Sequence, residues 1–232
     1  MHHQQLKWVT CPISHYEKTY QFLKQYTDER HTGTQDIILL LEHHPVITIG
    51  PTTLHEHIKE DRQIPIFKTN RGGKATYHGP GQLIIYPLLD LKRLGIKPSL
   101  LVHLLEETMI ACCRVFNVEA VSNPAARGVY IKGKKIGSVG LRISKGCSYH
   151  GASFNIDMDL QPFKNIVTCG MDNLEVTQLS EFKSCHISTI KTIYHDIFMQ
   201  KLNHYSSTSL TSNKISLETF SSLNTLRISH GS

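Results

Sequence analysis

The chain has 232 residues, of which 40% are hydrophobic, and a formal charge of +6 with histidine neutral. This length suits one sizeable hydrophobic core. The longest apolar runs, residues 37–41 and 83–89, are too short to cross a bilayer, and the first ten residues have no apolar signal core. These features exclude a membrane-spanning protein, and we expect a cytoplasmic chain with no membrane partner.

The six cysteines form no CxxC pair, which argues against a zinc ribbon or a thioredoxin-like motif. The sequence His55-Glu56-His57 lacks the HExxH spacing of metalloproteases, so we expect no metal. The positive charge favours an acidic partner. No dense Lys/Arg tract or aromatic-basic stripe is present, so nucleic acid is not expected as that partner. The cysteines are Cys11, Cys112, Cys113, Cys147, Cys169 and Cys185.

The first 70 residues predict one helix and several short strands. Apolar residues at helical spacing predict a helix over 13–30, with Ser14 as its cap and Glu17 three residues later. The sequence His43-His44-Pro45 reads as a turn between two strands. The predicted strands are 6–11, 36–42, 46–49 and 64–69.

Residues 71–82, RGGKATYHGPGQ, form the most unusual stretch of the chain. Its four glycines let backbone approach a ligand closely, and Pro80 favours a tight turn. Lys74 is followed by Ala75, which does not match the P-loop, and Ile84 breaks a dinucleotide fingerprint starting at Gly79. A buried strand at 83–91 follows, so we predict a polar binding loop at the mouth of a core strand.

The rest of the chain predicts two long helices, a hairpin and a further strand. The best helix is predicted over 98–118, beginning at Pro98. Residues 128–146 read as a hairpin that turns at 132–134, and 148–156 as a further strand. A short segment over 176–182 and a helix over 188–204 complete the expected fold. We assign residues 1–205 to one domain and 206–232 to a loosely held, Ser/Thr-rich tail with a short helix near 217–223.

Three further positions carry candidate chemistry. Lys135 stands between a glycine-containing turn and a Gly/Ser-rich strand. His150 precedes the small residues Gly151, Ala152 and Ser153. Cys169 precedes Gly170 in a loop, outside any apolar periodicity, which is unlike a core thiol.

Three segments resemble the lipoyl(octanoyl) transferase family in the family's own order. They are residues 71–82, the strand from Lys135 to Arg142 (KIGSVGLR), and His150-Gly151 with Cys169-Gly170 downstream. Residues 39–50 give a supporting match, and the resemblance covers roughly residues 6–180. Thr168 stands where the family usually has proline before the cysteine.

The resemblance implies an α/β fold, with a mixed sheet flanked by helices as in lipoate and biotin protein ligases. It implies transfer of octanoyl from acyl carrier protein to a lysine of lipoyl domains, in 2-oxoacid dehydrogenases and glycine cleavage H protein. Cys169 would carry the acyl group as a thioester, Lys135 would assist it, and neither ATP nor another cofactor would be needed. The implied substrate-binding residues are Arg71, Gly72, Gly73, Lys74, Ala75, Thr76, Tyr77, His78, Ser138, Val139, Gly140, Gly151, Ala152 and Ser153.

Several alternatives stay open at this point. Backbone amides near Gly72-Gly73, Gly79 or Gly151 are the candidates for an oxyanion site. His78 or His150 could activate the thiol in place of Lys135. The competing functions are an ATP-dependent lipoate or biotin ligase, a Cys/His hydrolase, and a basic nucleic-acid-binding module.

Overall fold

The computed structural model describes residues 4–53, 64–123, 126–167 and 174–224. Its centre is an eight-stranded mixed sheet in the order β11-β1-β2-β6-β10-β9-β8-β7. β1 pairs in parallel with both β2 and β11, and the pairs from β2 across to β7 are antiparallel. The strands are β1 Gln4–Thr10, β2 Ile37–Leu41, β6 Gln82–Leu88, β7 Val121–Ser122, β8 Val129–Ile131, β9 Lys134–Ser144, β10 Cys147–Asn155 and β11 Leu210–Ser216.

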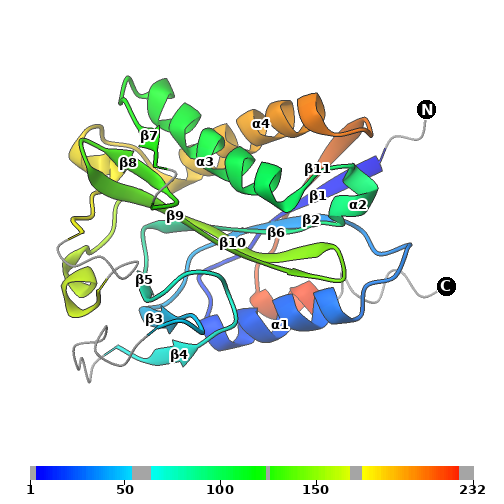
Figure 1. Ribbon diagram of the computed structural model, residues 1–232, viewed down its shortest axis with the longest axis horizontal. Coiled ribbons are helices and arrows are strands. Elements are labelled where there is room, and N and C mark those ends of the chain that lie inside the picture. Colours follow the sequence, from blue (N-terminus) through cyan, green and yellow to red (C-terminus); the bar gives the residue numbers. More distant parts are fainter. Residues whose placement is uncertain (1–3, 54–63, 124–125, 168–173, 225–232) are drawn as a thin grey trace.

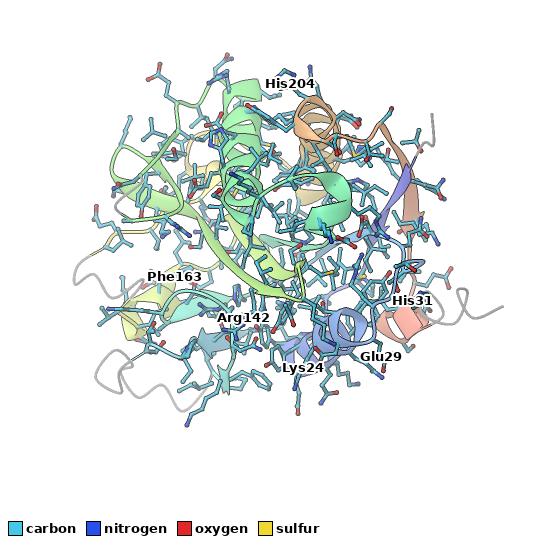
Figure 2. The ribbon with its side chains drawn as sticks, turned by 45° about the vertical axis from the view of Figure 1, so that its right-hand side comes forward. Lys24, Glu29, His31, Arg142, Phe163 and His204 are labelled. Carbon is cyan, nitrogen blue, oxygen red and sulfur yellow. The ribbon has the colours of Figure 1, made fainter. Side chains whose placement is uncertain are left out.

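Helices cover both faces of this sheet. α1 (Tyr16–Asp28) lies on one face, and α3 (Pro98–Val115) and α4 (Ile187–Tyr205) lie together on the other (Figure 1). Lys24 and Glu29 point outward from the α1 side (Figure 2). The predicted mixed sheet with flanking helices is confirmed. The short elements are α2 Leu91–Leu94, which the sequence did not predict, and the 3-10 turns η2 Gln161–Asn165, η4 Leu179–Glu181 and η5 Phe220–Asn224.

The central strands are apolar on both sides because both faces are covered. In β2, Ile38 and Leu40 pack toward α3 and α4, whereas Ile37, Leu39 and Leu41 pack toward α1. β6 divides its apolar side chains between the same two cores. Continuous apolar runs of this kind are therefore strands of a double-sided core.

A second, three-stranded sheet holds the residues that frame the site. Its order is β4 (Ile66–Lys68), β3 (Val46–Ile49) and β5 (Thr76–His78). The predicted strands on either side of His43-His44-Pro45 are confirmed, but β2 joins the large sheet and β3 the small one. β5 lies inside the stretch that the sequence analysis described only as a loop.

A predicted turn and a predicted helix cap, each based on a local sequence signal, had different outcomes. The predicted turn at 132–134 is confirmed: Lys132 and Gly133 have φ of 49° and 80°, the two positive values that a type I′ hairpin turn requires. The predicted Ser14 cap is wrong. His15 occupies the N-cap position of α1, and the Ser14 hydroxyl donates to the Pro12 carbonyl at 2.8 Å instead.

The expectation of a loosely held tail is wrong for residues 210–224. β11 pairs with β1 over seven residues, and Leu223 is fully buried against α1, with Phe220 edge-on to Phe22. Only Leu210 of β11 is buried, so no apolar pattern marked the strand. Backbone hydrogen bonds to β1 supply its stability.

Asp36 joins α1, α2 and the sheet, and its replacement by alanine is expected to destabilise the fold by about 3–5 kcal/mol. Its carboxylate is 1% exposed and contacts the guanidinium groups of Arg30 and Arg93, the latter at 2.8 Å. Removing it leaves these cations without their buried counter-ion. Urea unfolding measures the change. The control is Glu175→Ala, whose exposed pair with Lys134 is worth at most about 1 kcal/mol. Equal effects of the two substitutions would contradict the assignment.

Candidate active site

Arg71 anchors the glycine-rich loop over the sheet. Its guanidinium is buried and donates to the Thr48 carbonyl at 2.7 Å and to the Thr48 hydroxyl at 2.9 Å. The Gly72 amide donates to the Leu141 carbonyl at 3.2 Å, which fastens the loop to β9. Gly73 has a φ of +89°, a conformation that disfavours other residues, and Gly50 packs against its carbonyl. The loop is thus held in one place by β3 on one side and β9 on the other.

Lys135 is buried in the wall of the same region, with 2% of its surface exposed. Its Nζ donates to the Arg127 carbonyl at 2.8 Å and lies 5.3 Å from the centre of the Tyr130 ring. Its backbone pairs with the segment that follows position 173: the Lys135 amide donates to the Glu175 carbonyl at 2.8 Å, and the Thr177 amide donates to the Lys135 carbonyl at 2.9 Å. A lysine this deeply buried is rare without a specific role.

A chain of buried hydrogen bonds joins the glycine-rich loop to the Lys135 strand. The Thr48 hydroxyl that Arg71 contacts donates to His78 Nε2 at 3.3 Å. His78 Nδ1 donates to the Gln82 Oε1 at 2.7 Å, because the Gln82 amide nitrogen donates to Asn155 at 2.8 Å. Asn155 donates in turn to the Thr177 carbonyl at 2.9 Å. Such a network fixes the two walls of the site relative to each other.

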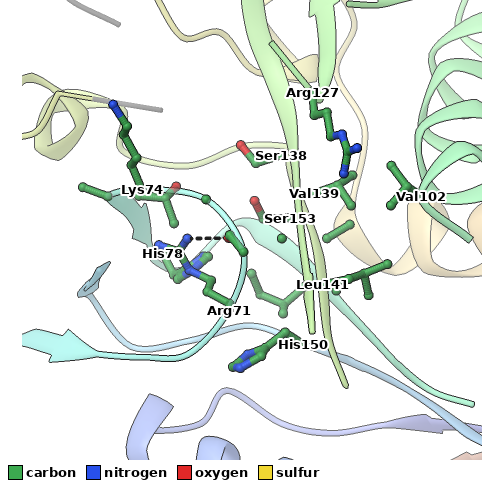
Figure 3. Close-up of a pocket in the computed structure, with 18 of the residues that line it drawn as sticks. Arg71, Lys74, His78, Val102, Arg127, Ser138, Val139, Leu141, His150 and Ser153 are labelled. Carbon is green, nitrogen blue, oxygen red and sulfur yellow. Dashed lines mark hydrogen bonds between the residues drawn. The ribbon is translucent and has the colours of Figure 1, made fainter. Parts of the chain in front are cut away.

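These elements enclose a cavity of about 460 Å³. Figure 3 shows Arg71 and His78 on one side of it, Ser138 and Ser153 across from them, and His150 at one end. Lys135 lines it, as does every residue of the predicted binding set except Tyr77. Along β5 side chains alternate, so Thr76 and His78 face the cavity while the Tyr77 ring packs 5.5 Å from Phe163 in a separate core. The expectation that Tyr77 lines the pocket is therefore wrong.

Two of the backbone amides predicted as oxyanion-site candidates are not available in the cavity. The Gly72 amide is committed to the Leu141 carbonyl, and Gly79 does not line the cavity. Gly73 and Gly151 do line it. Gly151 cannot carry a side chain, because a Cβ there would lie 1.9 Å from the Ile85 carbonyl oxygen.

Several lining residues come from distant parts of the chain and carry no signal in the sequence. Tyr86 interrupts an apolar strand and Tyr16 opens α1, but neither pattern signals a site without knowledge of the fold. They meet because α1 packs across β6 and β10. The lining residues missed from the predicted set are Tyr16, Thr52, Ile84, Tyr86, Val102, Ala126, Arg127 and Leu141.

Cys169, and the His55-Glu56-His57 sequence, lie outside the described residues. Each cysteine that the structure does describe lies outside the cavity lining and has a raised pKa because of burial. For Cys113 the pKa is about 12. Within the described ranges, no cluster of His, Cys, Asp or Glu side chains could hold a metal ion. The described part of the chain also contains no helix long and apolar enough to cross a membrane.

Burial keeps the histidines of the site neutral, and acid is therefore expected to destabilise the fold. Burial lowers the pKa of His78 and His150 to about 3, and that of His43 to about 4. Between pH 6.5 and these values the unfolded chain binds more protons, so stability is complete above pH about 6.5 and falls as pH decreases, by at most about 1.4 kcal/mol per pH unit per histidine. Urea unfolding between pH 7.5 and 4.5 measures this slope.

Two variants test this pH dependence, one at a buried and one at an exposed histidine. His78→Gln should reduce the slope of unfolding free energy against pH, whereas His204→Gln, at the exposed end of α4, should leave that slope unchanged. An unfolding free energy that stays constant across this range would contradict the buried, neutral state of these rings.

Comparison with known proteins agrees with this geometry. Residues 16–204 match the family model described as the lipoyl protein ligase A/B catalytic domain. Octanoyltransferases of Alkalilimnicola ehrlichii and Shewanella pealeana are 46% and 40% identical, over 71% and 82% of this chain and 76% and 90% of theirs.

Solved structures share the fold at low sequence identity. A lipoate-protein ligase A bound with ATP superposes with a TM-score of 0.73 at 15% identity, covering 98% of this chain and 94% of that one. The biotin protein ligase of Aquifex aeolicus, in complex with biotin and ATP, gives 0.54 at 16% identity over 88% and 73% of the two chains. The chain therefore belongs to the lipoyl protein ligase A/B catalytic-domain family and, within that family, to the octanoyltransferases, which are acyltransferases of protein lipoylation.

Proposed function

We propose that the chain transfers octanoyl from acyl carrier protein to a lysine of a lipoyl domain through a thioester on Cys169. The observation that carries the proposal is the buried amine of Lys135 in the wall of a 460 Å³ cavity framed by glycine-rich backbone. The similar octanoyltransferases support the choice of acyl group. A structural neighbour from Thermoplasma acidophilum, a bipartite lipoate protein ligase with its E2 lipoyl domain, supports the choice of acceptor.

The position of Cys169 in the sequence supports its role as the nucleophile. Ile166 packs in the small core with Ala75, and Glu175 and Thr177 are hydrogen-bonded to the backbone of Lys135. The described residues that flank Cys169 in the sequence therefore lie beside the site. The described cysteines support the choice by elimination, because their raised pKa values make them poor nucleophiles at neutral pH.

The reaction has two balanced halves. The Cys169 thiolate attacks the carrier thioester, a new C–S bond forms, and the departing carrier thiolate takes a proton from the Lys135 ammonium. The lysine amine of the lipoyl domain then attacks the enzyme thioester, and the neutral Lys135 amine accepts the proton that it loses. The C–N bond forms as the Cys169 C–S bond breaks, which restores the thiolate and the ammonium. No nucleotide enters either half.

Intact-mass spectrometry tests the proposal. The full chain is mixed with octanoyl-acyl carrier protein, without ATP, and a single octanoyl adduct on Cys169 is expected. Addition of a lipoyl domain should then move the adduct to the domain. Transfer that requires ATP would favour a ligase, and release of free octanoate instead of an amide would favour a hydrolase. A salt-dependent nucleic-acid complex without any adduct would favour the nucleic-acid module.

A further inference from the structure

Glu106 is a buried carboxylate to which the reaction described above gives no role. It lies on α3, one turn beyond Val102, and residues four apart share one face of a helix. Val102 lines the cavity, whereas Glu106 does not. The residue is only 9% exposed, and a glutamate this buried is rare unless its carboxylate is paired. A role of Glu106 in the reaction would therefore act through another residue that does line the cavity.

A single peptide group connects Glu106 to the amine of Lys135. The Gly128 amide donates to Glu106 Oε1 at 2.8 Å. The carbonyl of the same peptide belongs to Arg127, and it accepts from Lys135 Nζ at 2.8 Å. The peptide is trans, so its N–H and C=O groups point in opposite directions. The carboxylate and the amine therefore bind opposite edges of one peptide group.

Gly128 allows the lysine side chain to lie directly against this peptide. Its φ is +136°, and a Cβ at this position would lie 2.6 Å from Lys135 Cε and 3.0 Å from Lys135 Nζ. The same Cβ would also lie 2.4 Å from the Gly137 carbonyl oxygen. The place of the amine is thus set by the 127–128 peptide, and Glu106 holds that peptide from its other edge.

The two hydrogen bonds of the peptide strengthen each other. A carboxylate acceptor polarises the N–H group and leaves more negative charge on the carbonyl oxygen, which then accepts more strongly from an ammonium. The negative charge of Glu106 also acts on the amine through a region from which most water is excluded. Both effects favour the ammonium form of Lys135 over the neutral amine.

Glu106 supplies this negative charge at neutral and alkaline pH. Burial raises the pKa of its carboxyl, but the hydrogen bond from the Gly128 amide and the charges of neighbouring residues oppose that rise. The charged and titratable side chains around the Glu106–Lys135 pair are His103 on α3, Arg127, Tyr130 on β8, and the exposed pair of Lys134 and Glu175.

We propose that Glu106 is a positioning residue for Lys135, which acts through the Arg127–Gly128 peptide to fix the amine in place and to favour its protonated form. In the first half of the reaction, the ammonium then persists and stabilises the Cys169 thiolate. In the second half, the amine is a stronger base for the proton of the incoming lysine. The inference rests on the proposed function, which assigns both proton transfers to Lys135.

The test is the pH dependence of acyl-enzyme formation in Glu106→Gln. Glutamine keeps the size of the side chain and an oxygen that can accept from the Gly128 amide, but it removes the charge. Rapid-quench intact-mass spectrometry measures the rate with octanoyl-acyl carrier protein, without acceptor, between about pH 6 and pH 10. In the wild type the rate should fall at alkaline pH, where Lys135 loses its proton. In Glu106→Gln this fall should move to lower pH by roughly 0.5–1 unit.

Glu107→Gln is the matched control for this shift. It makes the same change one residue later on α3, in a side chain that is 33% exposed and pairs with Lys201 of α4 at 3.8 Å. The alkaline fall in rate should stay at its wild-type pH in this variant. A fall that does not move in Glu106→Gln, or that moves equally in both variants, overturns the inference.

A second measurement is independent of activity. NMR of isotope-labelled lysine side chains follows the protonation of Lys135, whose signal is identified by its absence in Lys135→Arg. Its titration should move to lower pH in Glu106→Gln and not in Glu107→Gln, and an unchanged titration overturns the inference. If the wild type forms no acyl-enzyme, the proposed function fails, and this titration alone decides the role of Glu106. If Glu106→Gln does not fold, Glu106→Met removes the charge without adding a buried donor and should produce the same shift.

Discussion

Replacement of Cys169 by alanine is expected to abolish octanoyl transfer, with a loss of roughly 10³-fold or more in turnover. Without the thiolate no covalent intermediate forms, and the carrier thioester must react with the acceptor amine directly. The measurement is transfer of octanoyl to a lipoyl domain, together with the intact mass of the chain after reaction with octanoyl-acyl carrier protein. The variant should show neither product nor adduct.

The matched control is Cys185→Ser, which removes a partly exposed thiol outside the cavity. It should keep both the adduct and the transfer rate of the wild type. An adduct that persists in Cys169→Ala would identify a different nucleophile. Transfer that persists without any adduct would show that the acyl group passes directly between carrier and acceptor.

The elements that sequence could predict are those whose pattern is local. The apolar run of β6, the periodic spacing of α3 and the Lys132–Gly133 turn each specify their own conformation. β11 could not be found in this way, because its stability comes from backbone pairing with β1, some 200 residues earlier, and not from its own side chains. The same holds for β5, which exists because β3 lies beside it.

The residues of the candidate site also separate into those that a local pattern predicts and those that depend on the fold. The glycine-rich stretch indicated a cavity because its composition fits no helix or core strand, and Arg71, His78 and Lys135 do line that cavity. The orientation of Tyr77 could not be predicted, since it depends on the register of β5 against β3. Tyr16 and His150 line the same cavity because α1 packs over β6 and β10, which no local pattern encodes.

Replacement of Lys135 by alanine is expected to lower octanoyl transfer by about 10²–10⁴-fold, the usual effect of removing a general acid–base group. Lys135→Arg separates the two roles of the amine. Arginine keeps the positive charge that stabilises the Cys169 thiolate and the departing carrier thiolate, which can leave without being protonated. It cannot lose its own proton, so it cannot serve as the base for the incoming amine. This variant should form the acyl-enzyme and then accumulate it. Rapid-quench mass spectrometry follows the adduct, and steady-state assays follow the amide product.

Lys134→Ala provides the matched control for this lysine. Lys134 is the neighbouring residue on β9, its side chain is 45% exposed, and it pairs with Glu175 at 3.3 Å outside the cavity lining. Its loss should leave both halves of the reaction close to wild type, and thermal unfolding confirms that each variant folds. Full activity in Lys135→Ala would contradict the pairing of this amine with Cys169, and the buried imidazoles of His78 and His150 would then be the groups to replace next.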